Sequence, residues 1–292
     1  MAFKFIEESN EQISLEEFVE YVRNEVDFTD QDSIQGASKA LFKLHNNRKF
    51  ITNLINDELK SMGLQKNNLY AGQSLILHSE PSFLVRAVTW LPESKNETRR
   101  ALERDINFYG IAHDHAFNLL TIGYHGPGYE TDFYEYDRSK VAGYIGEDIE
   151  MEFLERTRLG FGKILFMREA KDIHIQYPPE EMSISLNLMS QNHANTRNME
   201  QFIFDIEKKK IIGYPHYGVS NRTSLIDAAA AIANENTLDI LQTICISHID
   251  PRTRLQAFKS LYLHLGDQVI KQAAQDPHKL VNEAYKRGEL VK

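Results

Sequence analysis

Cysteine is almost absent from this chain: Cys245 is the only one in 292 residues. A single thiol excludes an intramolecular disulfide and any Cys-x-x-Cys metal or redox motif. Its neighbours Ile244 and Ile246 indicate an inert thiol in an apolar core. A chain without disulfides fits a reducing compartment, so we expect a cytoplasmic protein.

Long apolar runs and excess positive charge are also lacking. Nowhere do about eighteen apolar residues follow one another, and residues 1–12 contain no apolar core of signal-peptide length. The net charge of −9 disfavours non-specific binding to nucleic acid or to an anionic membrane. Phosphate-binding loops and dinucleotide glycine fingerprints are missing as well. We therefore expect neither nucleic acid nor membrane as a partner.

What the chain does contain is a series of strand signals. Hydrophobic residues make up 42% and aromatic residues 10% of the sequence, which suits a β-rich core. About ten short segments bounded by turn residues indicate a sandwich or barrel, and no helices alternate with them as a parallel α/β fold would require. These segments are 73–79, 82–91, 111–124, 129–137, 141–145, 149–154, 163–168, 172–176, 183–189 and 201–212.

Helical patterns flank the strand region on both sides. Ser14 and Glu17 have the spacing of a capping box, and residues 33–62 continue as a helix or helix pair. After a turn-rich linker the pattern predicts helices again, one of them capped by Asp250. Four short helices bury little surface alone, so we expect the last part to cover the barrel, with homo-oligomerisation or partner binding as alternatives. The predicted parts are N-terminal helices at 1–68, a barrel at 69–213 and a helical appendage at 220–292.

His113 and His115 stand two residues apart in the predicted strand 111–124. A strand directs residues i and i+2 to the same face, about 6.6 Å apart along the backbone. Two imidazoles on one face can bind the same metal ion. The turn residues Gly123, Gly126, Pro127 and Gly128 then predict that 129–137 returns beside this strand as a hairpin. A buried, hydrogen-bonded histidine pair is the alternative interpretation.

His174, in the predicted strand 172–176, is the candidate third ligand. Three neutral histidines suit Fe(II), with Zn, Ni, Cu and Mn as alternatives, and they leave open positions on the ion. A 2-oxoglutarate oxygenase would normally offer His-x-Asp/Glu. Here His115 stands where that motif has Asp or Glu, and Asp114 is expected on the opposite face of the strand. The class of 2-oxoglutarate oxygenases is therefore disfavoured.

This arrangement resembles the cupin superfamily. The first cupin motif has His-x-His, three or four residues, Glu, six residues and Gly, and here it becomes His113, His115, Leu119 and Gly126, with leucine replacing the glutamate. The cysteine dioxygenase-like iron enzymes also lack that glutamate, bind iron through three histidines and commonly contain His-Asp-His. Their later Ser-x-His-x-Tyr strand matches here only at Ser185, because Asn187 and Met189 replace the histidine and the tyrosine.

The resemblance implies a mainly β fold with helical additions, namely a cupin barrel (double-stranded β-helix or jelly roll). It also implies a mononuclear non-haem iron(II) oxygenase that uses O2 and a small amino-acid-like or thiol substrate. Two alternatives remain open. One is another metal-dependent cupin enzyme, an isomerase or a hydrolase. The other is a non-enzymatic metal-binding sensor or scaffold.

Arg86 is the candidate anchor for a substrate carboxylate. The cysteine dioxygenase-like family, which this chain resembles, has its carboxylate-binding arginine at a similar distance before the His-x-His motif. A guanidinium usually binds a carboxylate through two parallel hydrogen bonds. The alternative is a structural ion pair with Glu80 or Glu93. Two further candidates for catalysis are Tyr124, at the end of the predicted strand, and His125, in the glycine turn. Tyr129 and Tyr134 are weaker candidates for the lining of the site.

Overall fold

The protein is described here from a computed structural model, which covers residues 3–5, 7–61, 73–191, 200–215 and 218–291. Two compact units make up the chain: Met1–Tyr136 with Glu152–His193, and Asp137–Met151 with Ala194–Lys292. The N-terminal helices therefore share a unit with the strands. The predicted boundaries differ from this division, because residues 137–151 group with the C-terminal helices although they lie within the predicted barrel.

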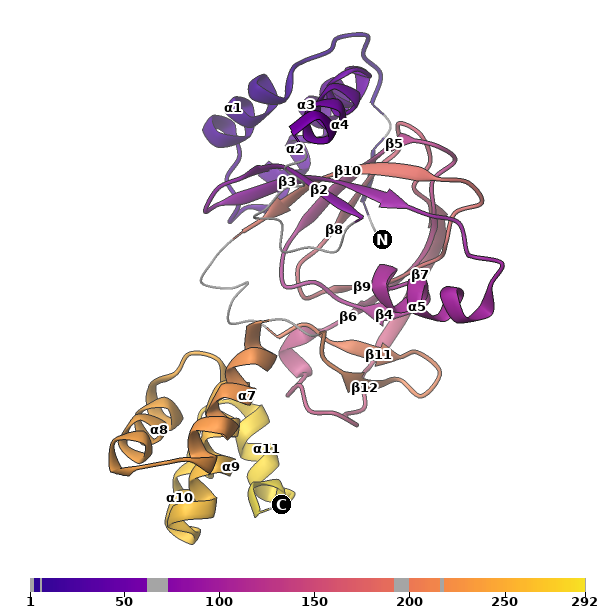
Figure 1. Cartoon of the computed structure of the whole chain (residues 1–292). Coiled ribbons are helices and arrows are strands. Elements are labelled where there is room, and N and C mark those ends of the chain that lie inside the picture. The colour runs from indigo at the N-terminus through magenta and orange to yellow at the C-terminus, as the bar shows by residue number, and fades with distance from the viewer. Residues whose placement is uncertain (1–2, 6, 62–72, 192–199, 216–217, 292) are drawn as a thin grey trace. The chain divides into compact units, whose positions relative to one another are not determined.

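The first unit contains two antiparallel sheets and five helices among the described residues (Figure 1). Its helices are α1 (Leu15–Glu25), α2 (Gln31–Gly36), α3 (Ser38–Asn46), α4 (Phe50–Ser61) and α5 (Glu97–Asn107). Its strands are β1 (Phe3–Phe5), β2 (Ser74–Ser79), β3 (Phe83–Trp90), β4 (Ala112–His113), β5 (Leu119–His125), β6 (Glu130–Tyr136), β7 (Met151–Arg158), β8 (Ile164–Met167), β9 (Asp172–Gln176) and β10 (Ser183–Ser190).

Sheet A has the strand order β1-β8-β5-β10-β3-β2. Its outer face packs against α1–α4, which lie across it in Figure 1. Helix α1 begins with the predicted capping box, in which Ser14 and Glu17 satisfy each other's backbone N–H groups. The shared apolar cluster contains Phe18, Val22, Leu41 and Leu44 from the helices and Leu120, Ile122, Leu186 and Leu188 from the strands. The central strands are therefore buried on both faces.

The four strands β4-β9-β6-β7 form the second sheet of this unit, which we call sheet B. A second apolar cluster fills the space between the sheets, with residues from both of them. It contains Leu84, Val88, Trp90, Leu119, Leu165, Met167 and Met189 from sheet A, and Phe133 from sheet B, with Tyr109, Tyr129 and Leu159 from the connections. We call the surfaces that meet in this cluster the inner faces. Among the described residues the strands form two facing sheets rather than one continuous closed barrel.

The predicted hairpin of 111–124 with 129–137 is wrong. Residues 111–124 form two strands in different sheets: β4 pairs with β9, whereas β5 pairs with β8 and β10. The returning strand β6 pairs with β9 instead of β5. The chain changes sheet around Asn118, whose backbone N–H donates to the Ser190 hydroxyl and whose side-chain oxygen accepts from the Glu169 N–H.

Gly128 is a position where the turn requires glycine. Its φ is +79°, and an added Cβ would lie 1.8 Å from the Leu159 carbonyl oxygen. Gly128→Ala should therefore destabilise the protein by about 3–5 kcal/mol through backbone strain and overlap together. Gly110 is the matched control, because its φ is +73° but no atom lies within 4 Å of the added Cβ. Gly110→Ala should cost only about 1–2 kcal/mol. Urea unfolding measures both, and equal losses would contradict the predicted overlap.

The second unit is mainly helical, as predicted. Its elements are η1 (Arg138–Lys140), β11 (Ile203–Asp205), β12 (Lys210–Gly213), α7 (Gly218–Ala231), α8 (Glu235–Ser247), α9 (Pro251–Leu265), α10 (Asp267–Ala273), α11 (Lys279–Lys286) and η2 (Glu289–Val291). Helix α9 begins as expected, because Asp250 accepts from the backbone N–H of Thr253.

Cys245 is buried in the apolar cluster of this unit, and burial raises its pKa to about 12, so its thiol is unreactive at neutral pH. No described helix combines the length and the apolar character needed to cross a membrane.

Two predicted strands of the second unit are corrected. Residues 141–145 form no strand, because the Glu147 carboxylate accepts hydrogen bonds from the backbone N–H groups of Ala142, Gly143 and Tyr144. Residues 201–212 contain the hairpin β11–β12 instead of one long strand.

Candidate metal centre

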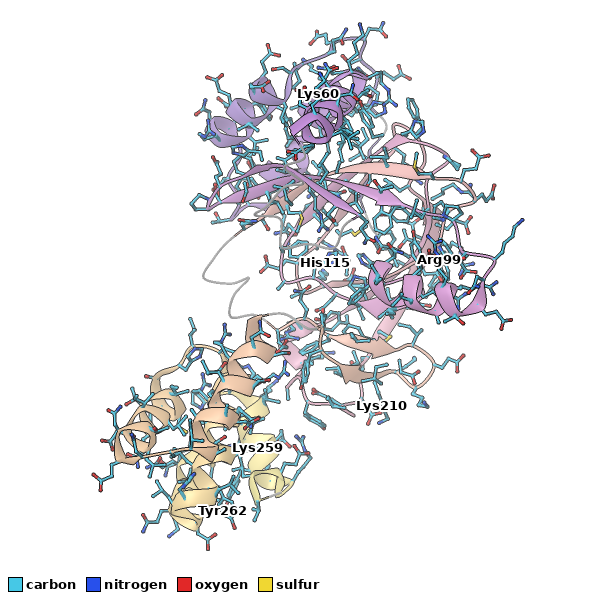
Figure 2. The ribbon with its side chains drawn as sticks, viewed as in Figure 1. Lys60, Arg99, His115, Lys210, Lys259 and Tyr262 are labelled. Carbon is cyan, nitrogen blue, oxygen red and sulfur yellow. The ribbon has the colours of Figure 1, made fainter. Side chains whose placement is uncertain are left out.

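His113 and His174 lie directly opposite each other in the antiparallel pair β4–β9. On its other side His174 is opposite Phe133, which belongs to the inner apolar cluster, so this row of side chains points between the sheets. His115 follows just after β4, where its carbonyl oxygen accepts from the backbone N–H of Ala170. Figure 2 shows His115 in the interior of the first unit. Strand pairing therefore brings together histidines that are far apart in the sequence.

The three imidazoles converge on one point. Each offers one nitrogen, and these nitrogens all lie within 4.8 Å of one another. The Nε2 atoms of His113 and His174 are 2.9 Å apart. The His115 ring lies 5.2 Å from that of His113 and 4.6 Å from that of His174, measured between centroids. This proximity of the three predicted side chains is what a common ligand would require.

Hydrogen bonding fixes the tautomer of His113. Its Nδ1 lies 3.0 Å from the carbonyl oxygen of Ile111, which can only accept, so Nδ1 carries the proton. In the neutral ring Nε2 then has a free lone pair that points at His174. The Nδ1 of His174 lies 2.9 Å from the sulfur of Met167, a weak acceptor. Both Nε2 atoms are consequently available to share either a proton or a metal ion.

The surroundings keep all three histidines neutral. Burial lowers the pKa of His113 to about 4. The pKa values of His115 and His174 are also well below the ordinary value, mainly through burial and then through the repulsion that protonated imidazoles would exert on each other. A neutral imidazole offers the lone pair that a metal ion needs. The cluster is therefore set up for metal binding over the whole neutral pH range.

The donor set fits a divalent transition-metal ion. Two nitrogens bound at right angles about 2.1 Å from one ion would be about 3 Å apart, close to the separation of the two Nε2 atoms. Imidazole suits Fe, Zn, Cu and Ni, and three protein ligands leave coordination positions open for a substrate. The half-buried His115 is the least covered of the three histidines.

Acid should destabilise the metal-free protein from about pH 6.5 downward. Unfolded His113 takes up a proton near 6.5, whereas the folded residue stays neutral until about 4. Between these values the unfolded state binds more protons, so the free energy of unfolding falls with the pH. His113 alone should lower it by about 2 kcal/mol between pH 7 and pH 5. Urea unfolding of the wild type and of His113→Gln across this range tests the prediction, and an identical pH dependence would contradict it.

Arg86 lies on the inner face of sheet A, between Leu84 and Val88 of the inner cluster. Its positive charge contributes to lowering the pKa of His115 and acts on Tyr129 as well. The two acids considered as its structural partners have other partners: Glu80 pairs with Arg23 and His78, and Glu93 pairs with Arg100 and Arg104. The structure therefore places Arg86 on the side of the sheet that faces the histidines.

Tyr124 does not join the histidines and is corrected as a site residue. It lies in the helix-side cluster of sheet A, where its hydroxyl donates to the carbonyl of Asn47 and its ring contacts Arg48. His125 is exposed at the end of β5, outside the histidine cluster. Tyr134 packs against Phe153, next to Asp132 rather than the histidines. Of the three tyrosines only Tyr129 belongs to the inner cluster.

Asp114, which was expected on the opposite face of the strand, is not part of the histidine group. Its carboxylate accepts a 2.6 Å hydrogen bond from the hydroxyl of Tyr136. Leu119, which replaces the glutamate of the cupin motif, is buried in the inner apolar cluster. The candidate metal centre of the described chain thus offers histidine nitrogens only.

Two contacts of the site were not anticipated from the sequence. Met167 contacts the Nδ1 of His174, and Thr121 bonds the side chain of Asn187 on the inner face of sheet A. The polar residue Thr121, in an otherwise apolar strand, was a signal for the second contact. No sequence pattern pointed to Met167, because the pairing of β8 with β5 could not be foreseen.

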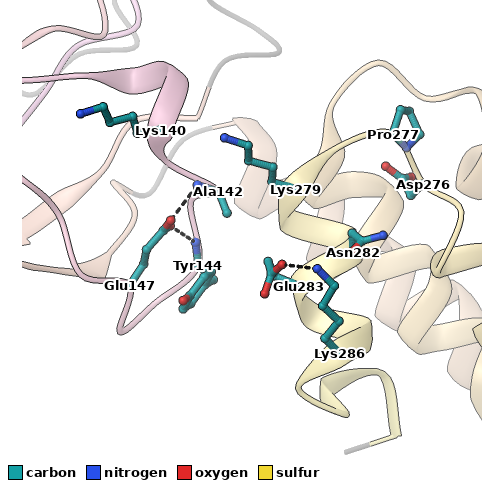
Figure 3. Close-up of a pocket in the computed structure, with 10 residues that line it drawn as sticks. All are labelled: Lys140, Ala142, Tyr144, Glu147, Asp276, Pro277, Lys279, Asn282, Glu283 and Lys286. Atoms are coloured by element: carbon teal, nitrogen blue, oxygen red, sulfur yellow. Dashed lines mark hydrogen bonds and ion pairs between the residues drawn. The ribbon is translucent and has the colours of Figure 1, made fainter.

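A pocket in the second unit has a volume of about 480 Å³ and is lined by 10 residues, which include three lysines and three acidic residues (Figure 3). Each lysine has an oxygen partner: Lys140 bonds Glu150, Lys279 bonds the Ser139 carbonyl, and Lys286 bonds Glu283. All three lysines thus already have hydrogen-bond partners, and the histidine cluster remains the better candidate site.

Comparisons with known proteins identify no family for this chain. No protein-family model matches the sequence, and no curated protein matches it. Among solved structures, a DMSP lyase is 15% identical with a TM-score of 0.25, covering 40% of this chain and 46% of that one. The DMSP lyase of Ruegeria pomeroyi is 14% identical with a TM-score of 0.27, covering 57% and 70%. A salicylate 1,2-dioxygenase from Pseudaminobacter salicylatoxidans is 8% identical with a TM-score of 0.30, covering 53% and 37%. The match to the first of these thus spans less than half of its length, and similarity at this level assigns no activity.

Proposed function

We propose that this protein is a metalloenzyme of the cupin type, in which His113, His115 and His174 bind one Fe(II) ion. The proposed reaction is the oxygenation of a small amino-acid-like or thiol substrate. The observation that supports it is the convergence of three neutral, largely buried imidazoles on one point. A bound iron ion would supply open coordination positions and electrons for chemistry with O2.

The residues of the chain would have distinct roles in this reaction. The three histidines are neutral, so they leave the charge of the ion uncompensated and favour an anionic substrate. Arg86 adds a further positive charge on the facing sheet and would bind a substrate carboxylate. The inner apolar cluster around Trp90, Tyr129 and Phe133 would exclude water from the reacting groups.

Metal analysis followed by oxygen consumption tests the proposal. Protein purified without oxygen should contain about one iron atom per chain and should consume O2 with a small thiol carboxylate or amino acid. The control is His264→Ala. His264 is exposed in the second unit, and its ring bonds the backbone carbonyl of Ala230. O2 consumption that persists in His174→Ala, or a purified protein without a stoichiometric metal, would contradict the proposal. Turnover without O2 would favour an isomerase or hydrolase instead.

A further inference from the structure

Three polar side chains form a row across the inner face of sheet A. Asn187 of β10 lies directly opposite Arg86 on one side and Thr121 on the other. Directly opposite residues in an antiparallel sheet place their side chains on the same face, with Cβ atoms about 4.5–5.5 Å apart. The flanking residues Leu84, Val88 and Leu119 belong to the inner cluster. The row therefore faces the space between the sheets, into which the histidines also point.

Asn187 is held in one orientation. The Thr121 hydroxyl donates to its side-chain oxygen over 2.5 Å, and both side chains are buried, with Asn187 only 3% exposed. Because the oxygen faces β5, the amide nitrogen is turned away from β5 and toward the side of Arg86. Within the part of the chain that the structure describes, no protein group bonds this nitrogen.

The amide nitrogen of Asn187 has two N–H donors that a ligand can use, and hydrogen bonds to a charged acceptor are stronger than those to a neutral one. Next to it stands a guanidinium, which is also a donor only. Two neighbouring donor groups, one of them cationic, are complementary to an anion whose oxygens bond both. A carboxylate fits this pair because its two oxygens lie in one plane, with one for each donor group.

We propose that Asn187 and Arg86 together bind the carboxylate of the substrate, with Thr121 as the positioning residue that orients the Asn187 amide. This inference rests on the proposed function, because it assumes that the substrate lies between the sheets with its other end toward the histidines. It makes the substrate a small carboxylate with a metal-binding group at its other end. It also makes Asn187 a determinant of specificity for acids over their amides.

Two probes that differ only in the acid group test this inference. Mercaptoacetate and mercaptoacetamide have the same thiol, but only the first has a carboxylate. Binding to the cobalt(II)-loaded protein is followed by the visible spectrum of the metal, so no turnover is needed. The wild type should prefer mercaptoacetate by at least about tenfold, the size expected for hydrogen bonds to a charged group.

The variants separate the role of Asn187 in acid binding from its role in packing. Asn187→Leu combined with Thr121→Val replaces both partners of the hydrogen bond by apolar groups of similar shape, which limits the loss of stability. This protein should bind cobalt normally, while its preference for mercaptoacetate falls by about tenfold. Asn187→Asp should abolish the preference, because the new carboxylate pairs with Arg86. Asn24→Asp changes the net charge equally on the exposed face of α1 and should keep the wild-type preference.

The outcomes distinguish this inference from the proposed function. Normal cobalt binding with an unchanged preference in the double variant would overturn the role of Asn187 and leave the metal centre intact. Absence of cobalt binding in the wild type would overturn the proposed function. In that case acetate is titrated into the metal-free protein, and the NMR signal of the Asn187 side-chain amide is followed. A shift of that signal would still support the acid-binding pair, and a constant signal would overturn it.

Discussion

Replacing His174 by alanine should reduce the affinity for a divalent metal ion by more than about a hundredfold. The loss of an outer-shell partner already lowers metal affinity by about 10–100-fold, and His174 would supply a ligand atom. Among the described residues, the group of His, Cys, Asp and Glu side chains that could hold an ion consists of His113, His115 and His174, so the variant would keep two of three ligands. Equilibrium dialysis against Zn²⁺ or Fe²⁺ followed by mass spectrometry measures the effect, with His264→Ala as the control that should bind like the wild type.

The fold of this variant has to be verified, because His174 is only 1% exposed. Removing a buried side chain leaves a cavity that costs about 2–4 kcal/mol. If His174→Ala does not fold, His115→Ala is the alternative, since His115 is half-buried and its loss perturbs the core less. A folded His174→Ala protein with full metal occupancy would rule out the three-histidine site.

Replacing Arg86 by lysine should raise the substrate concentration for half-maximal rate by about 10–100-fold, because lysine keeps the charge but not the planar pair of donors. The melting temperature should change little if Arg86 serves the substrate. The matched control is Arg99→Lys, at an exposed position of α5 where Arg99 pairs with Glu103 four residues on. That variant should behave as the wild type in both measurements.

The opposite pattern would assign Arg86 to the fold. A large fall in melting temperature with unchanged kinetics would mean that its guanidinium stabilises the inner face of sheet A. Measuring mercaptoacetate binding to the cobalt-loaded Arg86→Lys protein separates binding from turnover. Retained preference for the acid over the amide would also remove Arg86 from the acid-binding pair.

The three histidines that the structure brings together could be predicted from the sequence because their signals are local. The His113 and His115 spacing places both side chains on one face, and the strand with His174 was predicted with the bounds that the structure shows, Asp172–Gln176. The start of α9 at Asp250 and Pro251 could likewise be predicted, because a helix cap depends on a few neighbouring residues.

The partners of each strand could not be predicted in the same way. The break between β4 and β5 depends on Asn118, which bonds Ser190 and Glu169 from distant parts of the chain. The error at Tyr124 has another cause. Strand β5 is buried on both faces because α1–α4 cover the outer one, so its sequence lacks the alternation that would show which face meets the histidines.

The pairing of His113 with His174 has a consequence for how the metal would enter and leave. Strand β4 has only two residues, and these two histidines are 61 positions apart in the chain. An ion bound to both would act as a cross-link that closes this long loop and restrains a strand with few backbone bonds of its own. Hydrogen–deuterium exchange of the amides around His113 should therefore slow down on metal loading, with little change in β3 or β10. If this short strand has to detach from β9 before the ion leaves, the rate of metal release would not exceed the rate of that detachment.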